Sequence, residues 1–138
     1  MGRIIGIDYG RKRTGIAVTD PDRIIASPLT TVSTHELMNF LIKYIAEEDV
    51  DCIVIGEPKQ MDNTASESEQ YIKPFIKKLG KVFPDITIER VDERFTSMLA
   101  SQAILESGIS KKGRRDKSLV DKVSAAIILQ SYLDTLNI

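Results

Sequence analysis

Three acidic residues stand where the chain could assemble a reactive site. Asp8 ends the apolar run Ile4-Ile5-Gly6-Ile7, Glu93 follows an alternating segment, and Asp121 lies near the start of an apolar C-terminal stretch. In open α/β sheets, ligands gather outside the carboxyl ends of strands, and the first turn of a helix can reach the same edge. Converging carboxylates supply the hard oxygen ligands of Mg²⁺ or Mn²⁺, ions that can activate water and stabilise the leaving oxygen of a phosphodiester. We therefore expect a divalent-metal site.

Each of these acids also has a plainer interpretation, which the residues alone leave open. Asp8 precedes Tyr9-Gly10 and could be only a turn residue. Glu93 could form a surface ion pair with Arg94. Asp121 is three residues after Ser118, which is the spacing of a capping box, and an acid in a first helical turn is favoured in any case.

Basic residues flank the candidate metal ligands. One group follows Asp8 directly, and residues 111–117 hold five cations and one anion, whereas residues 47–69 hold eight acids and one lysine. The net charge of −1 therefore conceals a polarised chain that could present a cationic face to a polyanion. The residues we expect to contact nucleic acid are Arg11, Lys12, Arg13, Arg94, Lys111, Lys112, Arg114, Arg115 and Lys117.

Composition excludes several other classes of protein. A chain of 138 residues fits one domain, residues 1–138, and leaves no room for a second lobe. A single cysteine excludes a disulfide framework and a cysteine-based zinc site within one chain. A single histidine makes Ser-His-Asp catalysis an unfavoured interpretation. No run approaches about 18 apolar residues, and no secretory signal is visible. We expect a soluble, cytoplasmic protein whose chemistry depends on carboxylates.

The apolar periodicity predicts an α/β domain. Alternating or continuous apolar segments predict strands over residues 3–8, 14–19, 23–32, 52–56 and 86–91. Helical stripes occur within residues 37–45, 72–79, 95–107 and 119–136, with capping-box spacing at Ser33 and Glu36 and again at Ser66 and Glu69. Three closely spaced strands, followed by helices that return to further strands, predict a mixed sheet with parallel crossovers.

With these residues in view, the sequence resembles the RuvX/YqgF family of Holliday-junction resolvase-like proteins and pre-16S rRNA processing nucleases. The resemblance covers essentially the whole chain and is carried by four ordered segments: residues 5–17, 56–62, 92–97 and 117–130. The second segment departs from the commoner pattern at Glu57, Lys59, Gln60 and Asn63. The three acids are unaffected.

The resemblance implies an RNase H-like fold, with a five-stranded mixed sheet whose second strand is antiparallel and which is flanked by helices. It implies that Asp8, Glu93 and Asp121 are catalytic and bind the metal, and that the protein processes the 5′ end of pre-16S rRNA. Structured RNA or branched DNA would be the partner, with the protein a monomer or weak homodimer away from membranes.

Alternative functions are a Holliday-junction resolvase and a binding factor without catalysis. An ATP-binding module is a further alternative, because Asp8-Tyr9-Gly10 followed by Gly15 resembles the first phosphate loop of actin-like and sugar-kinase domains. Those domains need a second lobe.

Overall fold

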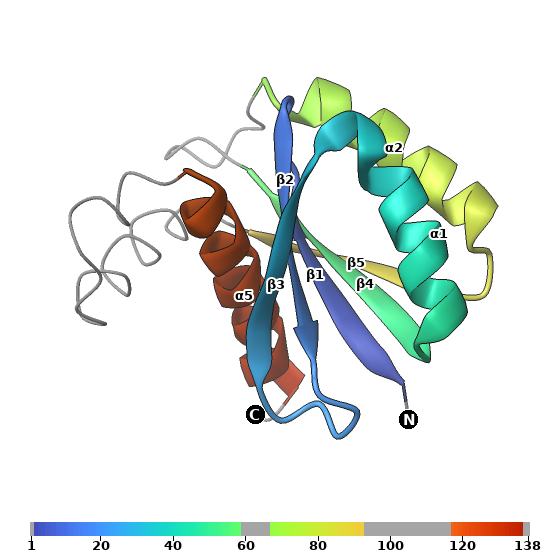
Figure 1. The fold of residues 1–138 in the computed structure, drawn as a ribbon, viewed down its shortest axis with the longest axis vertical. Helices are drawn as coiled ribbons and strands as arrows, with labels where there is room; N and C mark the ends of the chain where they lie inside the picture. The colour runs from blue at the N-terminus through green and yellow to red at the C-terminus, as the bar shows by residue number, and fades with distance from the viewer. Residues whose placement is uncertain (1, 59–66, 93–116, 137–138) are drawn as a thin grey trace.

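The computed structural model describes residues 2–58, 67–92 and 117–136, and its architecture is a five-stranded sheet between two helical layers (Figure 1). The strands are β1 (Arg3–Asp8), β2 (Arg13–Thr19), β3 (Ala26–Ser33), β4 (Val50–Glu57) and β5 (Thr87–Asp92). The helices are the 3-10 turn η1 (Thr34–Glu36), α1 (Leu37–Glu47), α2 (Glu69–Val82) and α5 (Lys117–Leu136). The helix expected over residues 95–107 lies outside the described residues.

The order of the sheet is β3-β2-β1-β4-β5. Strand β2 is antiparallel to both β1 and β3, whereas β1, β4 and β5 are parallel to one another. The predicted mixed sheet with an antiparallel second strand is therefore confirmed. The parallel strands β1, β4 and β5 end at one edge, hereafter the carboxyl edge, where Asp8 and the Glu57–Asp92 pair lie.

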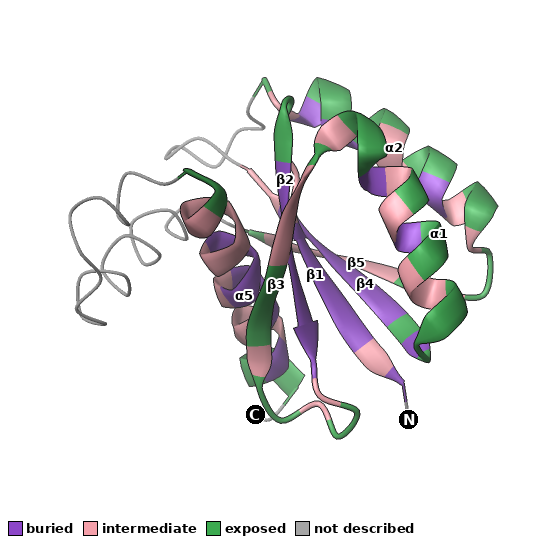
Figure 2. Ribbon diagram, in the orientation of Figure 1, coloured by how far each residue is buried: buried purple, intermediate pink, exposed green. Residues whose placement is uncertain are grey.

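Two apolar clusters hold the layers together. Helices α1 and α2 pack on one face of the sheet around Ile5, Ile53 and Ile55, and α5 packs on the other face around Ile4 and Val54 (Figure 2). Cys52 is buried in the α5 cluster. The middle strands β1 and β4 are covered on both sides, which explains their nearly continuous apolar sequences.

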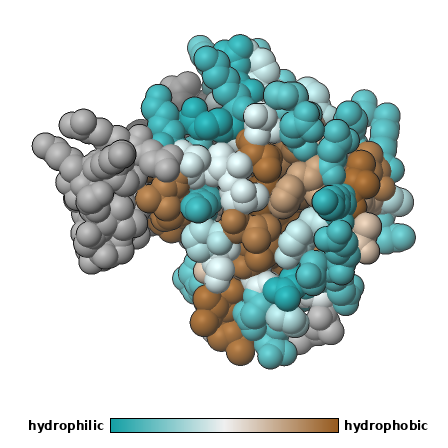
Figure 3. Space-filling model, viewed as in Figure 1, coloured by the Kyte–Doolittle hydropathy of each residue, from teal (hydrophilic) through white to brown (hydrophobic). Residues whose placement is uncertain are grey.

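Strand β3 is an edge strand and is less covered than its neighbours. Figure 3 shows apolar surface in the strip between β3 and α1, bounded by hydrophilic side chains over the helices. Pro28 lies within β3, where no further strand needs its missing N–H group, and the β2–β3 register shifts at Ile16/Ala17, opposite this part of β3.

The expected start of the third strand at Arg23 is wrong. Arg23 has φ 58°, in the left-handed region, and the Asp20 carboxylate accepts hydrogen bonds from the backbone N–H groups of Ile24 and Ile25. This Asp turn takes the amides that a strand would need, so pairing begins only at Ala26.

The capping box expected at Ser33 and Glu36 is also wrong. Ser33 makes no side-chain capping bond, and the helical segment opens instead with the 3-10 turn η1. The Thr34 hydroxyl donates to the carbonyl oxygen of Gly10 at 2.6 Å, and the Thr34 amide donates to that of Lys12. The start of the helical segment is thus tied to the turn that follows Asp8. Ser66 lies outside the described residues, and Glu69, its expected partner, is the first residue of α2.

Candidate active site

Asp8 and Asp121 meet at the carboxyl edge because α5 lies directly against β2. Asp8 pairs with Gly15 across the β1–β2 ladder. A Cβ atom on Gly15 would lie 1.9 Å from the backbone oxygen of Asp121, so only a glycine lets the helix come this close. Ser124 and Ala125, one turn further on, are buried small side chains that permit the same close approach.

The environment of Asp8 is unfavourable to a free carboxylate. Burial, and next the negative charge of Asp121, raise the pKa of Asp8 from 3.8 to about 7. A half-buried carboxylate beside a second carboxylate is stabilised by a proton or a cation between them. The carboxylate oxygens of Asp8 and Asp121 are ligands that hard divalent ions prefer. These two residues therefore fit Mg²⁺ or Mn²⁺.

Arg13 partly neutralises this acidic pair. Its Nε atom donates to Asp121 Oδ2 at 2.7 Å, and the Arg13 side chain remains 43% exposed. Arg13 was expected to contact nucleic acid, and its position allows a phosphate contact from the part of the guanidinium that Asp121 does not use. The alternative in which Asp121 belongs to a capping box is wrong, because Ser118 lies inside the described helix α5 and not at the position before a helix.

The third acid, Glu93, lies outside the described residues, as do Arg94, Lys111, Lys112, Arg114 and Arg115. Strand β5 ends at Asp92, the residue before Glu93, and pairs there with the end of β4. Strand β4 separates β5 from β1 in the sheet. Within the described ranges, no three His, Cys, Asp or Glu side chains gather to hold a metal ion.

The turn after Asp8 carries the expected cations Arg11 and Lys12 and is fixed to α2 by aromatic contacts. The Tyr9 and Phe75 rings have centroids 5.1 Å apart, and the Arg11 guanidinium lies 4.4 Å from the centroid of the Tyr71 ring. Lys117, the remaining expected cation, lies in α5 one turn before Asp121. Arg11 and Lys12 thus follow Asp8 in the chain, Lys117 precedes Asp121, and Arg13 contacts Asp121 directly.

The sequence did not reveal an ion-pair cluster at the same edge, centred on Arg90 of β5. The Arg90 guanidinium donates to the carbonyl oxygens of Ile55 and Gly56 and to the carboxylate of Glu69, with Nη2 and Oε1 2.5 Å apart. Glu57, an atypical residue of the second segment, lies 3.9 Å from Arg90. Arg90 thus joins the end of β4 to the first turn of α2. Arg90 is two residues after Ile88 and lies on the same, core-facing side of β5, so a charge at this position was the available signal.

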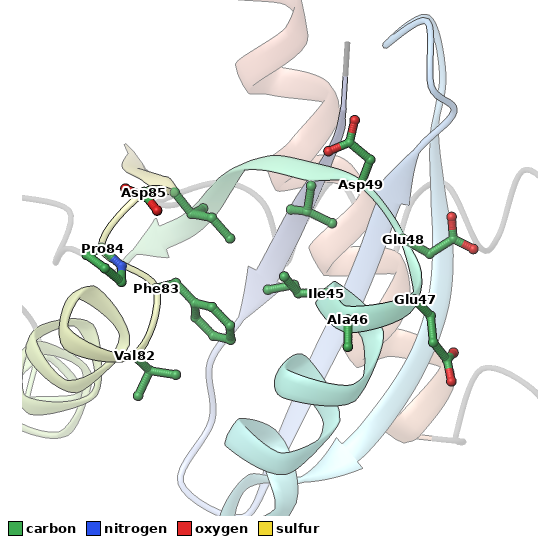
Figure 4. A pocket seen from close by; sticks show the side chains of 11 residues that line it. Ile45, Ala46, Glu47, Glu48, Asp49, Val82, Phe83, Pro84 and Asp85 are labelled. Carbon is green, nitrogen blue, oxygen red and sulfur yellow. The ribbon is translucent and has the colours of Figure 1, made fainter.

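The opposite edge of the sheet has a different character. A hollow with a volume of about 520 Å³ lies between the C-terminal ends of α1 and α2 (Figure 4). Phe83 and Ile45 line its interior, and its margin carries carboxylates of Glu47, Glu48, Asp49 and Asp85. An acidic margin repels phosphates, so this hollow does not compete with the carboxyl edge as a nucleic-acid site.

The strand order and the helices on both faces give the RNase H-like fold that is also found in RuvC. The structure of T. thermophilus RuvC in complex with Holliday junction substrate matches with a TM-score of 0.57 and 14% identity, covering 99% of this chain and 96% of that one. In the part of the chain that is described, no helix is long and apolar enough to cross a membrane.

Proteins of similar sequence identify the family within this fold class. A protein of Bacteroides fragilis (strain YCH46) named "Putative pre-16S rRNA nuclease" is 58% identical over 135 residues, covering 98% of each chain. The protein of the same name from Porphyromonas gingivalis (strain W83) is 60% identical over 134 residues, covering 97% of each. The model of the RuvX family, described as Holliday junction resolvase, matches residues 2–135. The chain belongs to the RuvX family, which confirms the resemblance of its four segments.

Proposed function

We propose that this protein is a divalent-metal-dependent nuclease that hydrolyses phosphodiester bonds at the 5′ end of pre-16S rRNA in the cytoplasm. The observation that carries the proposal is the meeting of Asp8 and Asp121 beside Arg13 at the carboxyl edge. The name shared by relatives at 58–60% identity supports the substrate.

In this proposal Asp8, Glu93 and Asp121 hold Mg²⁺ or Mn²⁺. When bound, such an ion lowers the pKa of water and stabilises the charge that develops on the phosphate. Asp8 would supply a carboxylate oxygen to the ion in its deprotonated form. Arg13 keeps Asp121 oriented through the Nε–Oδ2 hydrogen bond. Its exposed part, with Arg11, Lys12 and Lys117, receives the RNA backbone, and the expected contacts Arg94, Lys111, Lys112, Arg114 and Arg115 extend this surface.

Single carboxylate substitutions test the assignment. We expect Asp8→Asn, Glu93→Gln and Asp121→Asn each to abolish Mg²⁺- or Mn²⁺-dependent cleavage of a 5′-extended 16S rRNA precursor. Asp134→Asn is the matched control, since Asp134 is an exposed carboxylate on the same helix as Asp121 and should leave the rate unchanged. Full activity in any of the three variants would refute the role of that acid.

A second substrate follows from the description of the family model as a Holliday junction resolvase. The same variants should therefore be assayed on a four-way DNA junction. Cleavage of the junction but not of the precursor RNA would replace the proposed substrate, and salt-dependent RNA binding without cleavage of either would indicate a binding factor. Sedimentation of the protein alone would show whether it is a monomer or a weak homodimer.

A further inference from the structure

Tyr71 is the one exposed tyrosine or phenylalanine in the part of the chain that the structure describes, and it lies at the carboxyl edge. It is 37% exposed, in the first turn of α2. The other described aromatic residues are partly buried, and Tyr9 and Phe75, its neighbours, pack against the core cluster under α1 and α2. The apolar stripe of α2 runs through Ile72, Phe75, Ile76 and Leu79, so the core does not require an aromatic ring at position 71.

The position of this ring relative to the acids is fixed from two sides. Arg90 ties Glu69, two residues before Tyr71, to the end of β4 beside β1. The Arg11 guanidinium, three residues after Asp8, lies 4.4 Å from the centroid of the Tyr71 ring. The ring therefore lies on the α2 side of the acidic pair, while α5 carries Asp121 on the other face of the sheet.

The guanidinium of Arg11 lies over the exposed ring of Tyr71, and together the two planar groups offer a surface on which a nucleobase can stack. Aromatic rings and guanidinium planes both stack with unpaired bases, and every base offers a π face, so such contacts need no particular sequence. A base inside a continuous duplex already stacks on its neighbours and has no free face to offer. The chemistry of the pair thus selects single-stranded nucleic acid, with Arg11 also available to the adjoining phosphate.

We propose that Arg11 and Tyr71 form a stacking site for one unpaired base of a single-stranded RNA segment next to the cleaved phosphodiester. This inference rests on the proposed nuclease function and specifies the form of substrate at that site.

Binding measurements in a background that cannot cleave test this site. The probe is a fluorescein-labelled single-stranded RNA of about 12 nucleotides, within the usual site sizes for such strands, compared with the blunt duplex of the same sequence. In the Asp8→Asn full-length protein, we expect Tyr71→Leu and Arg11→Lys each to weaken single-strand binding roughly five- to tenfold. Duplex binding should change little. Tyr71→Phe keeps the ring and should bind as the parent does.

An abasic scan separates stacking from general charge. One nucleotide of the single strand at a time is replaced by an abasic site. We expect one position at which the abasic change weakens binding to the parent but has no further effect on Tyr71→Leu. Equal losses on single strand and duplex, unchanged affinity of Tyr71→Leu, or an abasic effect independent of Tyr71 would overturn the stacking site. Metal-dependent cleavage by the wild-type protein is measured separately, so failure of the nuclease proposal would be distinguished from failure of the stacking site.

Discussion

At the scale of single residues, the chemistry of this protein is concentrated in the pair Asp8 and Asp121. Asp8 is the last residue of a buried strand, and Asp121 faces the same edge from the first turns of α5. Burial, and next the negative charge of Asp121, raise the cost of ionising Asp8. Such a pair destabilises the metal-free protein but suits the binding of a cation. Proteins commonly lose some stability in this way at their functional sites.

The stability of the metal-free protein should therefore depend on the ionisation of Asp8. The carboxyl group ionises near pH 3.8 in the unfolded chain and near 7 in the folded one, so the free energy of unfolding falls as the pH rises through this window. We expect Asp8→Asn to be more stable than the wild type above pH 7, by roughly 2–4 kcal/mol, with the advantage disappearing towards pH 4. Urea unfolding in EDTA at several pH values measures this.

The matched control for this prediction is Asp22→Asn, a change at an exposed carboxylate in the turn before β3. It should alter the unfolding free energy little at any of these pH values. An Asp8→Asn protein less stable than the wild type at pH 8, or an advantage that does not vary with pH, would show that the ionisation of Asp8 does not destabilise the fold.

At the scale of elements, the site depends on how closely α5 approaches the sheet. Gly6 and Gly15 provide this approach, because a Cβ atom at either position would enter the space of the helix. At Gly6 the nearest atoms belong to Leu129 and Ala125, and at Gly15 they belong to the backbone of Asp121. Thr31 of β3 adds a hydrogen bond from its hydroxyl to the carbonyl oxygen of Ser118, which holds the first turn of α5.

Gly15→Ala should separate the two acids as well as destabilise the fold. The new methyl group would lie 1.9 Å from a backbone oxygen that cannot rotate away. We expect a loss of roughly 1–3 kcal/mol or more in unfolding free energy, as for overpacked cores, together with loss of cleavage. Gly80→Ala in α2 is the control, because its Cβ atom would meet only Ile88 at 4.0 Å. That change should stabilise the protein by about 0.5–1 kcal/mol. Thermal melts and cleavage rates measure both, and a fully active, stable Gly15→Ala protein would exclude this packing.

The elements predicted correctly from the sequence are those that are buried, because burial requires an apolar sequence that can be recognised. Strand β1 is continuous apolar sequence ending at Asp8, and the structure places it over the same residues. The start of β3 was missed because Ile24 and Ile25 have strand-like side chains, although the Asp20 carboxylate binds their amides. The Arg90–Glu69 ion pair was missed for a related reason: a pattern of residue types along the chain does not show which side chains meet across the sheet.

At the scale of the whole molecule, charge is separated along the sheet. The basic turn after Asp8 lies at the carboxyl edge, and the acidic hollow lies at the opposite edge. A nearly neutral protein can therefore approach RNA in one preferred orientation, since the field attracts phosphates at one edge and repels them at the other. The low net charge observed in the sequence is thus compatible with a polyanionic substrate.

Salt titrations should locate the contacting cations. For single-stranded RNA, each phosphate neutralised contributes about −0.7 to the slope of log K against log salt. We expect Lys12→Gln to reduce the magnitude of the slope by about this amount. Lys43→Gln should leave it unchanged, because Lys43 is an exposed residue of α1, whose C-terminal end borders the acidic hollow. Equal effects of the two substitutions would mean that RNA binding is not confined to the carboxyl edge.

The packing of α5 also has a consequence for the order in which the protein matures during synthesis. Strands β1 and β2 are neighbours in sequence and can pair early, but Arg13 and Asp121 are 108 residues apart in the chain. Contacts between such distant segments form late, since the intervening chain must first be ordered. The growing polypeptide therefore acquires its second carboxylate only when its last described helix has left the ribosome and docked on the finished sheet.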